Sequence, residues 1–437
     1  MRHFSILVYS LLAGFLLTGC SLQKQLNTAM VKHADPALDK ALFGFSLYDE
    51  STGKIVYEHY GDHVFTPASN TKLLTFFASM QHLPDSIPGF FVYETSDTLY
   101  LKPNGDPTFL HPDFKNQPLF EHLKKTNKPI VLFMEENPRF QRMGQSWSWS
   151  EYQATYMPER AQMPIYGNIA RFKVQNNQIK AIPGYFAADI VDKRNGSGKG
   201  TRITRQESDN VFVARSARSS SLARPFTQRV EPDITAYLLR DTLAYFGKEL
   251  LISHNNTVSD QQWKPFYTQS KDSVLKIMMH RSDNFFAEQM LLMCGQALTG
   301  HLSDRGAIQA IKKEDLSDLG TAPSWVDGSG LSRGNRMSPD FFIKLLKKIK
   351  DTQDWSRLQN ILPQGNDGTL SGLYKGYEDH IWGKTGTLSG DIALSGYLIT
   401  EKGHHYIFSF LVNHHQSSAN EARKAVEKVL TDIIREH

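Results

Sequence analysis

Three short strings spread along the 437-residue chain constrain its fold more than any other feature. They have the patterns S-x-x-K, S-D-N and K-T-G, and they occur in that order as residues 69–72, 282–284 and 384–386. Together such strings supply a serine nucleophile, a lysine base, a hydroxyl that relays a proton and a cation that holds a carboxylate. These groups must touch one another to react. The fold must therefore bring the beginning, the middle and the end of the chain to one place.

The S-x-x-K string at Ser69 and Lys72 is preferred to its two other copies because of what precedes it. Thr66 and Pro67 predict the N-cap and the first residue of a helix, so both residues would lie in the first turns. Positions i and i+3 share a helix face, which lets the hydroxyl and the amine meet. The unpaired first-turn amides could also stabilise an oxyanion. The plainer alternative is a capped helix with a surface lysine.

The rejected copies have simpler explanations. Ser51 lies in an expected hairpin turn and Ser273 in an expected helix, so each serine suits a conformational role. A second S-D-N string, at residues 208–210, precedes an expected strand within a different part of the chain. We therefore expect these copies to be structural.

The other two chosen strings lie where side chains can be held rigidly. Ser282 and Asn284 fall between two apolar-faced helices, and Asp283 is expected to have a structural role. A helix-linking polar turn is the alternative.

The K-T-G-T string has no second copy. It ends a strand, where the Lys384 ammonium and the Thr385 and Thr387 hydroxyls suit a carboxylate. Gly386 would let a substrate backbone approach. A strand end with a solvated lysine is the alternative here.

Other functional classes find little support in the sequence. A formal net charge of +4 argues against a dedicated nucleic-acid binder. The glycine-rich stretch 196–201 lacks the G-x-x-x-x-G-K-[S/T] pattern of a phosphate loop, and no H-E-x-x-H string occurs. We therefore expect neither a cofactor nor a metal site.

The two ends of the chain predict one antiparallel sheet flanked by helices, an α/β (α+β) fold. Alternating apolar residues from 43 to 59 predict a hairpin, and 380–385, 392–400 and 406–413 predict three consecutive strands. The last strand is apolar on both faces, so helices must cover both sides. One of them is the final helix, which begins with a capping box at Ser418 and Glu421. We expect a discontinuous domain of residues 38–85 and 223–437, interrupted by a strand-rich insertion at 86–222.

The N-terminus predicts export. Residues 1–20 predict a lipoprotein signal peptide, in which a short apolar run from Phe4 to Leu16 is followed by Leu17-Thr18-Gly19-Cys20, a string similar to the lipobox of bacterial lipoproteins. Cys20 would then be lipidated, with residues 21–37 as a tether. A plain secretory signal with an incidental cysteine is the alternative. The second cysteine, Cys294, lies in an apolar helix and is expected to be an inert packed thiol.

The chain as a whole resembles the penicillin-binding D-alanyl-D-alanine carboxypeptidase/endopeptidase family of the S13 (DacB-like) type. Besides the three strings, the resemblance includes G-D-P-T at 105–108, D-G-S-G-L-S-R at 327–333 and Asn413 at the end of the last strand. It implies a penicillin-binding transpeptidase-like domain that cleaves D-Ala-D-Ala, or a D-amino-acid crosslink, in peptidoglycan stem peptides.

The resemblance also implies roles for the residues of the three strings. Ser69 would form the acyl-enzyme, Lys72 would take its proton, and Ser282 would pass a proton to the leaving amine. Burial and the charge of Lys384 would lower the pKa of Lys72. A further set has binding roles: Asn284 for a substrate amide, Lys384, Thr385, Gly386 and Thr387 for the carboxylate, and the backbone amides of Ser69 and Thr387 for the oxyanion.

β-Lactams would acylate Ser69 as covalent inhibitors. Two other functions stay open, a β-lactamase-like hydrolase and a catalytically silent lipoprotein that binds cell wall. The expected location is the periplasm, with a lipid anchor on Cys20. Ser21 favours the outer membrane over the inner one.

Overall fold

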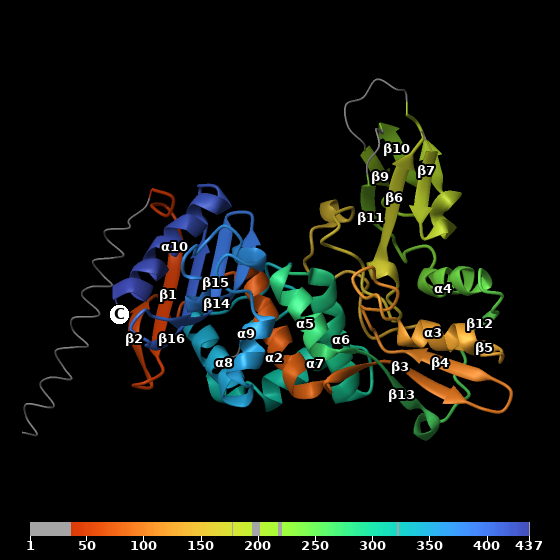
Figure 1. The fold of residues 1–437 in the computed structure, drawn as a ribbon, viewed down its shortest axis with the longest axis horizontal. Helices are drawn as coiled ribbons and strands as arrows, with labels where there is room; N and C mark the ends of the chain where they lie inside the picture. Colours follow the sequence, from red (N-terminus) through yellow and green to blue (C-terminus); the bar gives the residue numbers. More distant parts are fainter. Residues whose placement is uncertain (1–35, 177, 195–201, 217–220, 321–322, 437) are drawn as a thin grey trace, which may run out of the picture.

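The computed structural model describes residues 36–176, 178–194, 202–216, 221–320 and 323–436. The expected signal peptide with Cys20, most of the tether and the glycine-rich stretch 196–201 lie outside these residues. The described chain is elongated (Figure 1). A helix-covered sheet forms one end, a layer of helices forms the middle, and strand-rich parts form the other end.

The first sheet joins the two ends of the chain, as predicted. Its strand order is β14-β15-β16-β1-β2, and all neighbours are antiparallel. The N-terminal hairpin attaches through β1, whose residue Leu42 pairs with Asn413 of β16. The strands are β1 (Leu42–Asp49), β2 (Lys54–His59), β14 (Ile381–Leu388), β15 (Asp391–Ile399) and β16 (His405–Asn413).

Helix α10 (Ala419–Glu436) covers one face of this sheet, which confirms the predicted final helix. Its capping box forms as expected, because the Ser418 hydroxyl donates to Glu421 Oε2 at 2.7 Å. Its apolar stripe is buried against β14, β15 and β16 and includes Ala422, Val426, Val429 and Ile433.

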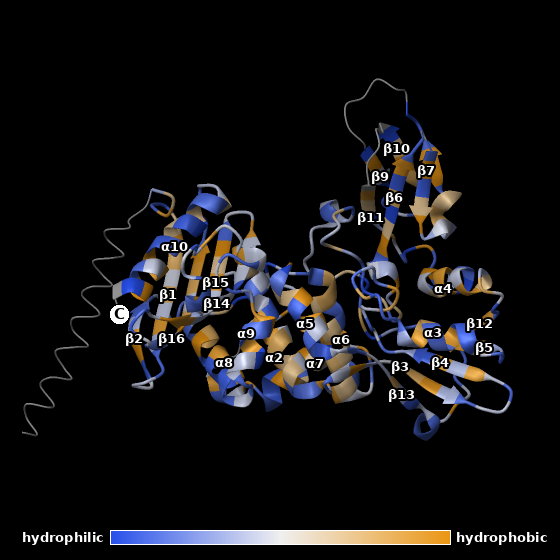
Figure 2. Ribbon diagram, viewed as in Figure 1, coloured by the Kyte–Doolittle hydropathy of each residue, from blue (hydrophilic) through white to orange (hydrophobic). Residues whose placement is uncertain are grey.

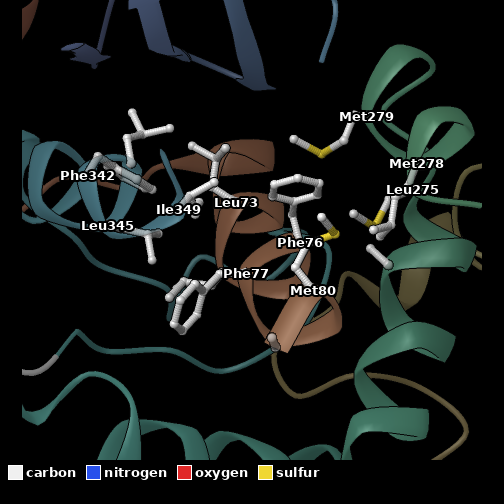
Figure 3. Close-up of a cluster of buried hydrophobic side chains, with 14 of the residues drawn as sticks. Leu73, Phe76, Phe77, Met80, Leu275, Met278, Met279, Phe342, Leu345 and Ile349 are labelled. Atoms are coloured by element: carbon white, nitrogen blue, oxygen red, sulfur yellow. The ribbon is translucent and has the colours of Figure 1, made fainter. Parts of the chain in front are cut away.

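A layer of helices covers the opposite face. Helix α2 lies at its centre, and nearly all of its side chains are buried, which is typical of a helix enclosed by protein. Figure 3 shows its Phe76 and Phe77 between side chains of α5 and α8. The helices of this layer are α2 (Lys72–His82), α5 (Lys271–His280), α6 (Asn284–Thr299), α7 (Asp304–Glu314), α8 (Pro339–Thr352) and α9 (Trp355–Ile361).

A second sheet lies beyond the helical layer, in the order β12-β5-β4-β3-β13. Its last strand runs to Ser270, far past the expected end of the insertion at residue 222. Hydrophobic side chains from the segment after 222, such as Ile234 and Leu238, also pack in its core. We therefore propose that the inserted region spans residues 86–270. Its elements are β3 (Ser86–Glu94), β4 (Leu99–Pro103), α3 (Pro118–Lys125), β5 (Ile130–Phe133), α4 (Ile234–Ala244), β12 (Leu250–Ser253) and β13 (Lys264–Ser270).

Two three-stranded sheets complete the insertion and project from it (Figure 1). Phe172 of β6 packs against Phe212 of β10, and Phe186 from the turn after β7 joins them. Figure 2 shows how apolar and polar residues alternate along the strands. The strands are β6 (Ile169–Gln175), β7 (Gln178–Ile182), β8 (Ile190–Asp192), β9 (Arg202–Arg205), β10 (Phe212–Ser216) and β11 (Ser221–Pro225). Within the described parts of the chain, no helix is long and apolar enough to cross a membrane.

Candidate active site

Ser69 lies in a tight turn immediately before the buried helix α2. The turn, η1, is a 3-10 helix over Ala68–Thr71 with Pro67 as its N-cap. The prediction that Thr66 caps the helix and Pro67 begins it was therefore wrong. The backbone N–H of Thr66 instead donates to Asn413 Oδ1 at 2.8 Å, which ties this segment to the end of β16.

A neighbouring loop packs closely against this turn. Ala68 has a φ of 48°, a left-handed conformation that is uncommon for a residue with a side chain. Gly330 packs so closely here that a Cβ on it would lie 1.9 Å from the Ala68 carbonyl oxygen. Such strained backbone persists where its surroundings fix it, and it is concentrated at functional sites.

Lys72 is fully buried and its ammonium nitrogen is held from three sides. Nζ lies 3.0 Å from Ser69 Oγ, 2.6 Å from Asn284 Oδ1 and 2.7 Å from the Ser329 carbonyl oxygen. The predicted meeting of Ser69 and Lys72 is thus present. The two carbonyl oxygens fix the nitrogen beside the serine hydroxyl.

The S-D-N string forms the loop between α5 and α6. Ser282 has a φ of 55°, and its Oγ accepts a hydrogen bond from Lys384 Nζ at 2.9 Å. Asp283 caps α6 by accepting from the backbone N–H of Phe286 at 3.1 Å, which confirms its structural role. Asn284 therefore begins a helix and is aimed rigidly at Lys72.

The K-T-G-T string lies on β14, the edge strand of the first sheet. Lys384 is completely buried, and it contacts the hydroxyl of Ser282, which lines the cavity described below. A Cβ at Gly386 would lie 2.6 Å from the Pro67 carbonyl oxygen. Gly386 was predicted to let a substrate backbone approach the strand. In the structure, the turn that carries Ser69 packs against this glycine instead.

An open cavity of about 760 Å³ lies in front of these groups. Four predicted residues line it, namely Ser69, Ser282, Asn284 and Thr387. The other predicted residues, Lys72, Lys384, Thr385 and Gly386, are buried beside it. The inserted region contributes Ser146, Ser148, Glu151, Tyr156 and Met157 to the lining.

Burial is the main electrostatic influence on both lysines. It lowers the pKa of Lys72 from 10.5 to about 8, although Asp327, Asp283 and Glu288 raise it in part. The pKa of Lys384 lies well below its usual value because of burial first, and then because of the positive charges of Lys72 and Arg423. Burial thus lowers the pKa of Lys72 as predicted. The repulsion between the two lysines lowers mainly the pKa of Lys384.

A buried carboxylate shapes the loop that supports Lys72. Asp327 accepts hydrogen bonds from the backbone N–H groups of Gly330 at 2.8 Å and Ser332 at 2.7 Å. It also accepts from Asn335 Nδ2 at 2.7 Å and from Trp147 Nε1 at 2.9 Å. The sequence identified the D-G-S-G-L-S-R string only through its resemblance to the family. The role of this string in presenting the Ser329 carbonyl to Lys72 was not predicted.

The other S-x-x-K strings and the second S-D-N string lie away from this site. Ser51 is in the exposed β1–β2 turn, and Ser273 donates to the backbone at the start of α5. The loop at 208–210 precedes β10, and its Asn210 bonds to Thr227. The thiol of Cys294 is buried, which raises its pKa to about 12 and makes it a poor nucleophile.

The sequence matches the D-Ala-D-Ala carboxypeptidase 3 (S13) family over residues 22–433. The chain belongs to this family. It is a serine-type D-Ala-D-Ala carboxypeptidase, as the resemblance predicted. Among curated S13-like relatives, it is 26% identical to the D-alanyl-D-alanine carboxypeptidase of Actinomadura sp. (strain R39), over 88% of this chain and 80% of that protein. It is also 27% identical to the D-alanyl-D-alanine carboxypeptidase DacB of Haemophilus influenzae, over 34% of this chain and 33% of that protein.

The fold of this S13 chain is similar to solved structures. The crystal structure of penicillin binding protein 4 (dacB) from Haemophilus influenzae matches with a TM-score of 0.69 and 19% identity, covering 94% of this chain and 99% of that one. A second crystal structure of that protein, complexed with a β-lactam, matches with a TM-score of 0.63 and 18% identity, over 90% and 95% of the two chains. These matches confirm the predicted mixed α/β fold.

Proposed function

We propose that Ser69 attacks the carbonyl carbon of a D-Ala-D-Ala bond in a peptidoglycan stem peptide and forms an acyl-enzyme. The observation that carries this assignment is the 3.0 Å contact between Ser69 Oγ and the buried Lys72 Nζ at the wall of the cavity. A nucleophile and its base within hydrogen-bond reach, with the base oriented by further groups, form the arrangement that activates a serine. Here Asn284 and the Ser329 carbonyl orient the base.

Lys72 takes the serine proton only when its amine is neutral. With a pKa of about 8, roughly a tenth of the molecules carry a neutral Lys72 at pH 7. Burial therefore brings the base close to the working pH, where general-base catalysis is most efficient.

This pKa predicts the pH dependence of acylation. The rate constant for acylation by a penicillin should rise about tenfold from pH 7 to pH 9 and then level off, with its midpoint near pH 8. Stopped-flow measurement with a fluorescent penicillin would record this. A rate independent of pH over this range would contradict the role of Lys72 as the base.

Ser282 and Lys384 provide the route for returning a proton to the leaving amine. Ser282 lines the cavity, and its Oγ contacts Lys384 Nζ at 2.9 Å. Burial lowers the pKa of Lys384, which makes its proton easier to give up than that of an exposed lysine. The backbone amides of Ser69 and Thr387 are suited to bind the oxyanion, because β14 is an edge strand packed on the nucleophile turn.

The substrate is a peptide that ends in D-Ala-D-Ala, and β-lactams compete for the same serine. Purified protein should release D-alanine from such a peptide and should hold penicillin as a long-lived adduct. A β-lactamase-like hydrolase would instead turn penicillin over rapidly, and a silent cell-wall-binding protein would do neither. The same cavity is open enough to admit a D-amino-acid crosslink, so endopeptidase activity on crosslinked muropeptides belongs to the proposal.

We also propose that the mature protein is periplasmic and held on the outer membrane by a lipid on Cys20. The lipobox-like string Leu17-Thr18-Gly19-Cys20 supports this. A Cys20→Ala variant should move from the membrane fraction to the soluble fraction after cell disruption. Unchanged partitioning would contradict the anchor.

A further inference from the structure

Neither active-site lysine lines the cavity in which the carboxylate of the substrate would lie. Lys72 must be neutral to act as a base. Lys384 is completely buried, and its pKa is lowered by that burial and then by the charges of Lys72 and Arg423. Arg423 belongs to α10 and lies outside all three sequence strings.

Arg423 reaches the end of the K-T-G-T string. Its Nη2 donates a hydrogen bond to Thr387 Oγ1, and Thr387 lines the active-site cavity. Ala419, one turn earlier on α10, also lines that cavity, so this face of the helix is turned toward the site. Thr385 and Arg423 share the lining of a second, small cavity with Tyr374 and Val426.

Within the described chain, Arg423 lacks an anionic partner. The buried Arg160, by contrast, is paired with Asp304 at 2.6 Å. Among the residues that the structure describes, no carboxylate forms an ion pair with Arg423. Its buried Nε has no hydrogen-bond partner there.

The acidic groups next to it on α10 are otherwise engaged. Glu421 accepts from the Ser418 hydroxyl, and Glu427 accepts from the backbone N–H of Tyr374. Burial lowers the pKa of the half-buried Arg423 guanidinium, but an arginine starts so far above neutrality that it keeps its charge at working pH. It is therefore a permanent cation with unused donor capacity at the carboxylate end of the site.

We propose that Arg423 is a specificity-determining residue that recognises the C-terminal carboxylate of the substrate together with Thr387. Because the guanidinium donates to Thr387 Oγ1, the threonine hydroxyl hydrogen is free to donate to a carboxylate oxygen. The charge of Arg423 then favours an anion over a neutral peptide end. This inference rests on the proposed function, since it concerns the leaving D-alanine of that reaction.

Two matched substrates test it, a peptide ending in D-Ala-D-Ala with a free carboxylate and the same peptide with a C-terminal amide. In Arg423→Gln, kcat/KM for the acid should fall about 10- to 100-fold, as expected for loss of a hydrogen bond to a charged group. The value for the amide should change less than about threefold, so the preference for the acid should shrink. Arg423→Lys should recover part of the preference, because it keeps the charge but loses the planar fork.

A matched control is Lys424→Gln, which removes a cation from the exposed neighbouring position. It should leave kcat/KM unchanged for both substrates. If Arg423 only holds α10 against the sheet, Arg423→Gln should lower kcat/KM equally for the acid and the amide, and this result would overturn the proposal. An unchanged kcat/KM for both substrates would also overturn it. Failure of the proposed function is distinguishable, because the unmodified protein itself would then release no D-alanine.

Discussion

Replacement of Ser69 by alanine is expected to lower the rate of D-alanine release by about 10⁴-fold or more, and to remove covalent labelling by penicillin. The substitution deletes the oxygen that lies 3.0 Å from Lys72 Nζ, so no acyl-enzyme can form. The fold should persist, because Ser69 is only half-buried and loses a single side-chain contact. Steady-state release of D-alanine, together with gel fluorescence after labelling, measures both effects.

The chain offers a matched control for this experiment in its unused S-x-x-K string. Ser273 is exposed at the start of α5, where its hydroxyl donates to the Ser270 carbonyl. Ser273→Ala should therefore keep full labelling and activity. Labelling that survives in Ser69→Ala, or disappears in Ser273→Ala, would show that the wrong serine has been assigned.

Replacement of Glu288 by alanine is expected to destabilise the protein by about 3–5 kcal/mol. Glu288 is buried on α6, where its Oε1 accepts from the Ser329 backbone N–H at 2.8 Å and its Oε2 lies 3.6 Å from Arg160 Nε. Alanine would leave that N–H unpaired and Arg160 with less compensation for its buried charge. Because Ser329 also holds Lys72, the folded fraction should lose activity as well. Urea unfolding followed by circular dichroism measures the free-energy difference.

Two further variants separate charge from packing at Glu288. Burial raises the pKa of this carboxyl to about 7, so glutamine resembles the protonated form that is already populated at neutral pH. Glu288→Gln should therefore be clearly milder than alanine. Glu207→Ala, which breaks an exposed ion pair with Arg229, should change stability by less than about 1 kcal/mol. Equal effects of Glu288→Ala and Glu207→Ala would contradict the importance of the buried cluster.

The first sheet was predictable because its signals are local and strong. Strands β14, β15 and β16 follow one another through short turns, and β16 is apolar on both faces. The capping box of α10 gave its start. The N-terminal hairpin was expected in the same sheet, but its place beside β16 was not predicted.

The features that the sequence did not predict depend on contacts between residues far apart in the chain. The pattern Thr66-Pro67 is typical of a helix start, yet Ala68 is left-handed, Gly330 packs against it, and a 3-10 turn precedes the α-helix. The inserted region that we propose ends at residue 270, later than the expected end at residue 222. Strands β12 and β13 pair with strands more than a hundred residues earlier in the chain, which no local pattern announces.

The candidate site also has a part that the sequence predicts and a part that it does not. The three strings identified the groups that bear the chemistry, since each requires particular residue types at fixed spacing. The residues that support them do not follow a spacing rule. Asp327 and Glu288 bind backbone N–H groups of the 327–332 loop. Arg423 donates a hydrogen bond to Thr387 from a helix whose sequence pattern indicates only an amphipathic helix. Such partners become visible only when the folded contacts are known.

Mass spectrometry of the protein after brief exposure to penicillin and acid quenching is the most direct test of the account. The account predicts one penicilloyl adduct per chain, located on the peptide that contains Ser69. An adduct on any other residue, or a folded and active protein that acquires none, would contradict the assignment of Ser69 as the nucleophile.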